Sequence, residues 1–330
     1  MNFSAPRLLK NLLYERDITR EVYGLYTLLN LAVTTRQPAG HNIYQSDWDA
    51  LIVLDALRVD ALREVADEYP FIGEINKKTS VGSTSKEWLL KTFTELYSEE
   101  IANTTCVTGN GFVHWLQDDP PKYLDFSATS GSAVERIDIL ERALNRNVVH
   151  ASTFEHIEEL WPLAETNPTA PVPDAESVTE HAIAQSRNRN PDRLLVHYMQ
   201  PHAPYVSNGG ERGYLTDTEL SPFAALIDGK TNRAEVWDLY IQNTRYVLDS
   251  VADLLENIDA ETVVITADHG ELFGEWYMYG HTVGFPHPKL KRVPWVETTA
   301  EDQRTIDPDP QKPSDIDESV EEHLEDLGYK

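Results

Sequence analysis

The chain has 330 residues, of which 55 are Asp or Glu and 28 are Lys or Arg, so its formal charge at neutral pH is −27. Such a charge repels a phosphate backbone, and because the sequence shows no local basic patch we expect no nucleic-acid partner. Apolar residues make up 41% of the chain, which is enough to fill a core and excludes a disordered acidic chain.

A single cysteine, Cys106, excludes an internal disulfide framework and a thiolate metal cluster. No segment approaches about twenty consecutive apolar residues, and the amino terminus lacks a signal-peptide pattern, so we expect a cytoplasmic protein without a transmembrane segment. The acidity is typical of proteins that stay hydrated in concentrated salt, and it favours a halophilic, haloarchaeal type of protein. An acidic face for a basic partner is the alternative.

Residues 1–45 are expected to form a helical segment that packs on the rest of the chain. Apolar residues recur at helical spacing over residues 6–14 and 19–33, which predicts two amphipathic helices. Peripheral contact with a membrane surface is the alternative to packing, because basic side chains are frequent here for so acidic a chain. These basic residues are Arg7, Lys10, Arg16 and Arg20.

The main domain is predicted to span residues 46–297. Short apolar runs alternate there with stretches of helical periodicity, which predicts an α/β fold with a mostly parallel sheet. The expected strands cover residues 50–54, 105–107, 147–149, 194–198 and 262–266, and the expected helices cover residues 59–69, 132–144, 177–187 and 233–258. Residues 298–330 are rich in Asp, Glu and Pro, which predicts an acidic tail that closes with a short helix over 320–327.

Three of the predicted strands end in residues that bind metals or anions. Asp55 follows the first strand, His202 follows the fourth, and Asp268 and His269 follow the last. Ligands of open α/β sheets bind outside the carboxyl ends of the strands, so we expect these side chains to lie at one edge of the sheet. Carboxylates and an imidazole together suit a divalent cation such as Mn²⁺, Zn²⁺, Mg²⁺ or Ca²⁺. The alternative is that Asp268 caps a helix and His269 is a structural histidine.

Five motifs occur in a fixed order along the chain. They are Leu51-Ile52-Val53-Leu54-Asp55, Gln200-Pro201-His202-Ala203-Pro204-Tyr205, Asp268-His269-Gly270-Glu271, Gly280-His281 and Arg292-Val293-Pro294-Trp295. Together they resemble the alkaline phosphatase and sulfatase superfamily over about residues 47–297. The ending Leu324-Glu325-Asp326-Leu327-Gly328-Tyr329 is also similar to that of many sulfatase-like chains.

The resemblance implies an alkaline phosphatase-like three-layer sandwich, with helices on both faces of the sheet, and a metal-dependent hydrolase or transferase acting on phosphate or sulfate esters. It implies that Asp55, Asp268 and His269 hold one divalent metal ion. Sulfatases place a second aspartate directly after the first, where this chain has Ala56, which favours a sparser site. A second, weaker ion site is the alternative to a single ion.

The expected nucleophile is a hydroxyl group. The formylglycine motif of sulfatases is missing, and Cys106 is better explained as a small buried residue. At the corresponding place, residues 80–89 form a hydroxyl-rich turn that leads into a predicted helix, whose amino-terminal amides favour an anion. The resemblance places the nucleophile at Ser85, with Thr84 as the runner-up; helix capping is the structural explanation for either residue.

The resemblance implies that His202 and His281 contact the transferred anion, and Lys86 is a weaker candidate for such a contact. His281 is also the expected acid that protonates the leaving alcohol. The substrate is expected to be an anionic ester, free or linked to a glycan or lipid. Phosphoester chemistry is favoured over sulfate because formylglycine is missing.

Two other functions stay open: a catalytically silent protein that binds an anionic glycan or lipid head group, and an acidic interaction scaffold. The segment Trp276-Tyr277-Met278-Tyr279, just before Gly280-His281, is a candidate for stacking on a sugar.

Overall fold

The computed structural model describes residues 39–117, 147–166 and 170–310, together with residues 26, 30, 33 and 34. The helices expected over residues 6–14, 132–144 and 320–327 lie outside these ranges, as does most of the one expected over 19–33. Among the described residues, no helix is long and apolar enough to cross a membrane.

Seven strands form one mostly parallel sheet in the order β2-β9-β6-β1-β5-β3-β4. Strands β6, β1, β5, β3 and β4 run parallel to one another, whereas β9 is antiparallel to both β6 and β2. The strands are β1 (Ala50–Leu54), β2 (Asn76–Thr79), β3 (Thr104–Thr108), β4 (His156–Glu159), β5 (Arg193–Tyr198), β6 (Ala260–Thr266) and β9 (Arg292–Ala300). Strands β7 (Leu272–Phe273) and β8 (Tyr279–Gly280) form a separate short hairpin.

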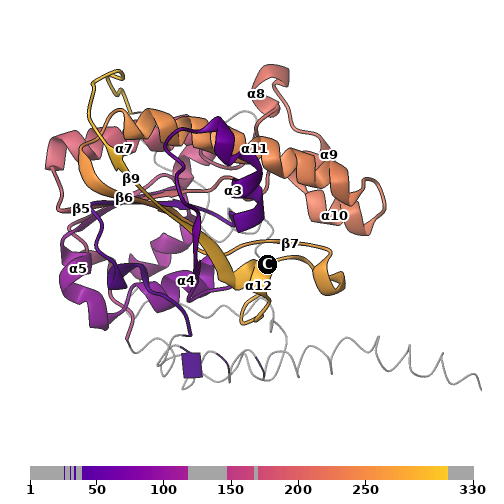
Figure 1. The fold of residues 1–330 in the computed structure, drawn as a ribbon, viewed down its shortest axis with the longest axis horizontal. Helices are drawn as coiled ribbons and strands as arrows, with labels where there is room; N and C mark the ends of the chain where they lie inside the picture. Colours follow the sequence, from indigo (N-terminus) through magenta and orange to yellow (C-terminus); the bar gives the residue numbers. More distant parts are fainter. Residues whose placement is uncertain are drawn as a thin grey trace, which may run out of the picture.

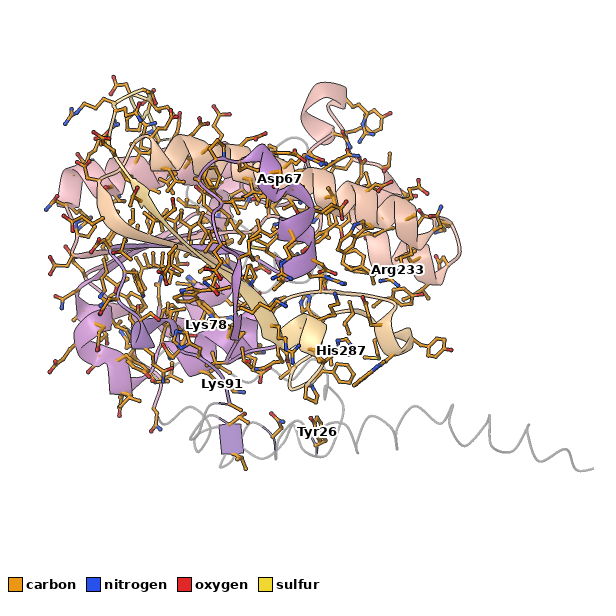
Figure 2. All side chains as sticks on the ribbon, viewed as in Figure 1. Tyr26, Asp67, Lys78, Lys91, Arg233 and His287 are labelled. Carbon is orange, nitrogen blue, oxygen red and sulfur yellow. The ribbon has the colours of Figure 1, made fainter. Side chains whose placement is uncertain are left out.

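Helices cover both faces of the sheet, as expected for a three-layer α/β sandwich (Figure 1). The side chains of β1 alternate between the two layers: Ile52 and Leu54 pack in the core formed with α3, α7 and α11, and Leu51 and Val53 pack in the core formed with α4 and α5. Side chains fill the space on both faces (Figure 2). Because β1 is buried on both sides, it carries no alternation of polar and apolar residues.

The α-helices are α3 (Val59–Val65), α4 (Ser85–Thr92), α5 (Ser98–Ala102), α7 (Ala175–Arg189), α8 (Gly209–Arg212), α9 (Asp217–Leu220), α10 (Pro222–Ile227), α11 (Arg233–Leu255) and α12 (Pro288–Lys291). The long helices start at side-chain caps. Asp174 accepts a hydrogen bond from the Ser177 amide at the start of α7, and Asn232 accepts one from the Glu235 amide at the start of α11. Helix α7 ends at Asn190, whose φ of 47° is left-handed.

The expected strand over residues 147–149 is wrong, because only a single bridge between Thr94 and Val148 forms there. The sheet edge is instead β4, in which every residue is only half-buried and no apolar run marks the strand.

The sheet also extends past the expected domain boundary at residue 297. Strand β9 continues to Ala300, and Arg187 of α7 then forms an ion pair with Asp302. Residues 298–302 are therefore part of the folded body, because they pair with β6 and contact α7, rather than the beginning of the acidic tail.

Candidate active site

Asp55 lies at the carboxyl end of β1 and is fully buried. Its Oδ2 atom accepts hydrogen bonds from Ser85 Oγ and from Asn110 Nδ2, each at 3.0 Å. Burial by itself would raise the pKa of Asp55, but the neighbouring imidazoles of His197, His202 and His269 hold that pKa well below its ordinary value. Asp55 is therefore a carboxylate at neutral pH.

Asp268 and His269 follow β6, the strand beside β1, and both are fully buried. Asp268 Oδ1 accepts the amides of Ala56 and His269, at 3.1 and 2.8 Å. His269 Nδ1 lies 2.7 Å from the Gly270 carbonyl, which only accepts, so Nδ1 carries the hydrogen and Nε2 offers a lone pair. That Nε2 lies 3.6 Å from Asp55 Oδ1 and 3.4 Å from Asp268 Oδ2.

The turn after His269 has no room for a side chain. A Cβ atom on Gly270 would lie 2.0 Å from the Lys289 carbonyl oxygen, and the Gly270 amide donates to the Leu290 carbonyl at 2.8 Å. Helix α12 therefore fixes the path of the loop that carries Asp268 and His269, which requires glycine at this position.

Ser85 and Thr84 have different environments at the start of α4. Ser85 Oγ lies 3.0 Å from Asp55 Oδ2 and 3.2 Å from His269 Nε2. Thr84 is the N-cap, and its Oγ1 accepts the Glu87 amide at 3.1 Å. Of the two hydroxyls, the one on Ser85 contacts the carboxylate and the imidazole, and the one on Thr84 satisfies a helix amide.

Buried oxygen atoms of this cluster are left without partners among the described residues. Asp55 Oδ1 and Asp268 Oδ2 accept no hydrogen bond, and His197 Nε2 also has no partner, 3.6 Å from Asp55 Oδ2. Two neighbouring buried carboxylates, each with an oxygen that has no hydrogen-bond partner, are unfavourable. The donor set of carboxylate oxygens and imidazole nitrogens fits a divalent cation, whose ligand atoms here lie within 4.8 Å of one another for Asp55, His197 and Asp268.

A second group of possible ligands, His202, Glu271 and His281, lies beside the first. The ring of His281 is 4.4 Å from that of His269 and 5.1 Å from that of His202, measured between centroids. His281 Nδ1 lies 3.1 Å from Glu271 Oε1. Burial would lower the pKa of His281, but Glu271 outweighs it and raises that pKa above its ordinary value.

Two further residues weighed from the sequence are Lys86, as a weaker contact for the anion, and Cys106, as a buried residue rather than a nucleophile. Lys86 Nζ lies 4.4 Å above the ring of Trp115, so its contact with a transferred anion stays a prediction. Cys106 is buried in β3, where burial raises the pKa of the thiol well above its ordinary value, in keeping with a structural residue.

The sequence reasoning missed three residues of the site. Asn110 follows β3, so the rule that singled out Asp55 and Asp268 would have found it. His197 is a polar residue that directly follows the apolar run Leu194-Leu195-Val196 within strand β5, and that mismatch is its only signal in the sequence. Glu271 directly follows Asp268-His269-Gly270, and its role depends on the hairpin that returns His281 to it.

No protein-family model and no curated protein matches the chain. The fold is similar to the soluble domain of lipooligosaccharide phosphoethanolamine transferase A from Neisseria meningitidis, with 15% identity, a TM-score of 0.47 and coverage of 77% of each chain. It is also similar to the periplasmic domain of a phosphoethanolamine transferase from Campylobacter jejuni, with 13% identity, a TM-score of 0.42 and coverage of 75% and 77%. For a lipoteichoic acid synthase from Listeria monocytogenes the identity is 11%, the TM-score 0.39 and the coverage 84% and 72%. These likenesses are weak, so the function of the chain is inferred from its own residues.

Proposed function

We propose that the chain is a metal-dependent enzyme that transfers or hydrolyses phosphate esters, with Ser85 as its nucleophile. The observation that carries this proposal is the position of Ser85 Oγ, 3.0 Å from Asp55 Oδ2 and 3.2 Å from His269 Nε2, in a buried cluster with two unpartnered carboxylate oxygens. Asp55, Asp268 and His269 are the proposed ligands of one divalent ion.

A divalent cation held by these ligands would supply positive charge that lowers the pKa of a neighbouring hydroxyl and offsets the charge of the transferred group. The protein's own part is positional. Asp55 accepts the hydroxyl hydrogen of Ser85 and so fixes the rotamer of its side chain. Ser85 is also the first residue of α4, where free backbone amides favour an anionic group.

The proposed reaction has two steps. The Ser85 hydroxyl gives its proton to solvent and Oγ bonds to phosphorus as the bond to the leaving oxygen breaks, while His281 gives that leaving oxygen a proton. Water or an acceptor alcohol then attacks the phosphorus of the phosphoserine ester and gives its proton to His281. The bond from phosphorus to Ser85 Oγ breaks in this step, and Oγ regains a proton from solvent. His202 is the proposed contact for the phosphoryl oxygens, and its ring lies beside that of His281, with the two centroids 5.1 Å apart.

Binding without turnover, the alternative expected from the sequence, does not explain why the Ser85 hydroxyl lies against two of the three proposed metal ligands, Asp55 and His269. A sulfate ester remains the second candidate substrate class, since the same ligands suit both anions.

The test compares two hydroxyl variants in the purified full chain, with the metal content measured by elemental analysis. Aryl phosphate, phosphodiester and sulfate esters are the substrates. Ser85→Ala should lower phosphoester turnover by about 10³-fold or more while the chain keeps its divalent ion, because the nucleophile alone is lost. The matched control Thr84→Ala should keep turnover within a few-fold and lose about 1 kcal/mol of stability, the usual cost of a lost helix cap. Equal turnover by wild type and Ser85→Ala would exclude Ser85 as the nucleophile.

A further inference from the structure

A pocket of about 430 Å³ beside α3 is lined by ten residues, and five of them are Lys or Arg. Only 28 of the chain's 330 residues are basic, so this concentration sets the pocket apart from the acidic molecule around it. The cations come from separate parts of the chain, and no basic run is visible in the sequence because the fold brings them together. They are Arg58, Arg63, Lys77, Lys289 and Arg292.

Two of the five cations are held in place by the protein. Arg58 makes two hydrogen bonds to the Asp60 carboxylate, at 2.9 and 2.7 Å, and a third to Glu275 at 3.0 Å. Lys289 Nζ reaches the same Asp60 carboxylate at 2.5 Å. Burial would raise the pKa of Asp60, but Arg58 and Lys289 hold that pKa well below its ordinary value. These two cations therefore form a fixed wall of the pocket.

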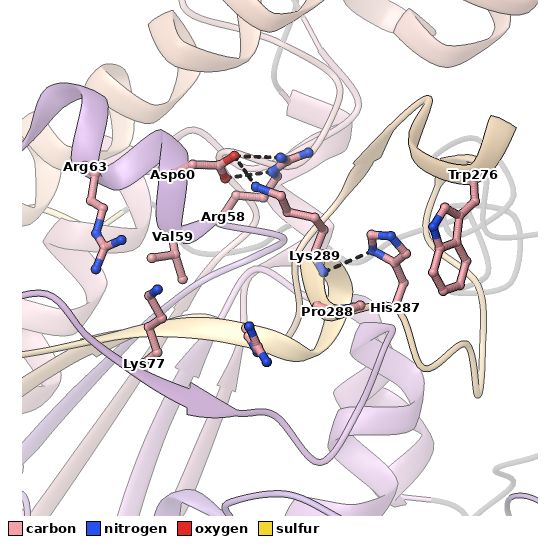
Figure 3. A pocket seen from close by; sticks show the side chains of 10 residues that line it. Arg58, Val59, Asp60, Arg63, Lys77, Trp276, His287, Pro288 and Lys289 are labelled. Carbon is pink, nitrogen blue, oxygen red and sulfur yellow. Dashed lines mark hydrogen bonds and ion pairs between the residues drawn. The ribbon is translucent and has the colours of Figure 1, made fainter.

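The other three cations, Arg63, Lys77 and Arg292, are exposed and line the pocket. Arg63 and Lys77 lie on the side of the pocket away from Trp276 (Figure 3). Arg63 donates to a backbone carbonyl, that of Ile75, at 3.3 Å. Within the described ranges, no carboxylate lies within ion-pair distance of Lys77 or Arg292. Five cations face two carboxylates, that of Asp60 in the lining and that of Glu275 against Arg58, so the lining keeps a net positive charge. Like charges held together repel unless an anion joins them.

An aromatic wall closes the pocket opposite Arg63 and Lys77 (Figure 3). Trp276 is 66% exposed, and its ring meets that of His287 edge-on, with centroids 4.5 Å apart. The backbone of Trp276 has a φ of 52°, a left-handed conformation that is unfavourable for a bulky side chain. An indole held exposed in a strained backbone beside five cations offers an apolar surface for the organic part of an anionic ligand.

We propose that this pocket is a second anion site, distinct from the Ser85 cluster, which binds the phosphate group of an organic phosphate. Arg guanidinium and Lys ammonium groups are the side chains that recognise a tetrahedral phosphate, and the pocket has the volume of a small-ligand site rather than of a single ion. The rest of the surface is acidic, so a compact ligand fits this site better than a nucleic acid, whose backbone would extend over repelling surface.

The pocket adjoins the back of the loop that carries Asp268 and His269. Arg58 Nη1 donates to the Glu271 carbonyl at 3.0 Å, and the Gly270 amide donates to the Leu290 carbonyl of α12 at 2.8 Å. The phosphate site and the Ser85 site are thus separated by one loop, and each can be tested without the other.

The experiment titrates inorganic pyrophosphate into the full chain by calorimetry, in dilute buffer with EDTA. Without divalent ions the carboxylates of the Ser85 cluster repel an anion, so any pyrophosphate that binds in EDTA binds elsewhere. A negative result in this experiment therefore does not argue against Ser85 as the nucleophile, and an inactive Ser85 site does not argue against the phosphate pocket. Lys77→Glu combined with Arg292→Glu should weaken pyrophosphate binding by about tenfold or more, because two attractive contacts become repulsive. The matched control combines Lys230→Glu with Arg304→Glu, two exposed residues outside the pocket, and should bind like wild type within about twofold despite its equal charge change.

A second double variant, Lys77→Gln with Arg292→Gln, removes the two positive charges without adding negative ones, so it disturbs the fold less. It should weaken pyrophosphate binding by less than the Glu pair does. Sedimentation with phosphatidylcholine vesicles, with and without phosphatidic acid, shows the source of the phosphate. Binding to phosphatidic acid vesicles that the Glu pair abolishes would assign a lipid phosphate, and pyrophosphate binding without vesicle binding would assign a soluble one. Undetectable binding to wild type, or equal binding by the Glu pair and its control, would overturn the proposal.

Discussion

At the scale of single residues, the two unpartnered carboxylate oxygens of Asp55 and Asp268 allow us to predict how the stability of the chain depends on a bound metal ion. Without metal these two buried carboxylates repel each other, so Asp268→Asn should raise the free energy of unfolding of the EDTA-treated chain by about 1 kcal/mol. With a saturating divalent ion the wild type should gain about 3 kcal/mol, the value for an ion at one hundred times its Kd, and the variant should gain little. Urea unfolding with and without EDTA measures both effects.

The control for this prediction is Asp259→Asn, at an exposed carboxylate whose oxygen accepts the Asp302 amide and can be replaced by an amide oxygen. This variant should keep the full stabilisation by metal. If Asp268→Asn were stabilised by metal as much as wild type, Asp268 would not be a ligand.

A second prediction at this scale concerns how Lys291 makes the free energy of unfolding depend on pH. Burial lowers the pKa of Lys291 from 10.5 to about 8, although the nearby Glu87 carboxylate acts in the opposite direction. The unfolded chain therefore binds more protons than the folded chain between pH 8 and 10.5, and in that window the contribution of Lys291 to stability rises with pH. Lys291→Met should stabilise the protein at pH 7 by up to about 3 kcal/mol, and this advantage should vanish by about pH 10.5. Urea unfolding across this pH range checks it, with Lys230→Met as the exposed control; a constant difference between variant and wild type would contradict it.

At the scale of elements, helix α11 holds the turn that places Asp55. The Tyr240 hydroxyl donates to the Ala56 carbonyl at 2.7 Å and accepts the Arg58 amide at 2.9 Å. Ala56 has a φ of 60°, so these bonds stabilise a backbone conformation that alanine disfavours. Tyr240→Phe leaves two buried backbone groups unpaired and should cost about 1–3 kcal/mol of stability and lower turnover as Asp55 shifts.

Tyr69 offers the matched control, because its hydroxyl also bonds to α11, at the Arg245 carbonyl and Asp249, away from the site. Tyr69→Phe should lose stability but keep turnover. Steady-state assays at a temperature where both variants stay folded separate the two effects, and equal turnover in both variants would show that α11 does not position Asp55.

The same scale explains what the sequence could and could not predict. Strands β1, β5 and β6 were predictable because each is an apolar run buried on both faces. Strand β2 reads Asn-Lys-Lys-Thr and is mostly exposed, so its pairing with β9, rather than its own composition, makes it a strand.

Likewise, Asp55, Asp268 and His269 could be identified from the sequence, because each follows a local apolar run that predicts the end of a buried strand. The sequence could not predict the contact of Glu271 with His281, which depends on the β7–β8 hairpin, nor the gathering of five cations from distant segments.

At the scale of the whole molecule, the charge of −27 predicts how stability depends on salt. Repulsion among exposed carboxylates acts over about 10 Å in 0.1 M salt and about 3 Å in 1 M salt, so KCl should stabilise the folded chain. If KCl acts by screening the carboxylates, most of the rise in Tm should occur below about 0.5 M KCl. If KCl acts instead because it is excluded from the protein surface, Tm should keep rising at molar concentrations. The combined Lys230→Glu and Arg304→Glu variant has a net charge four units more negative than wild type and should show a steeper rise in Tm. Scanning calorimetry from 0.05 to 2 M KCl measures both curves, and a Tm that stays level from dilute buffer upward would contradict a salt-dependent, halophilic fold.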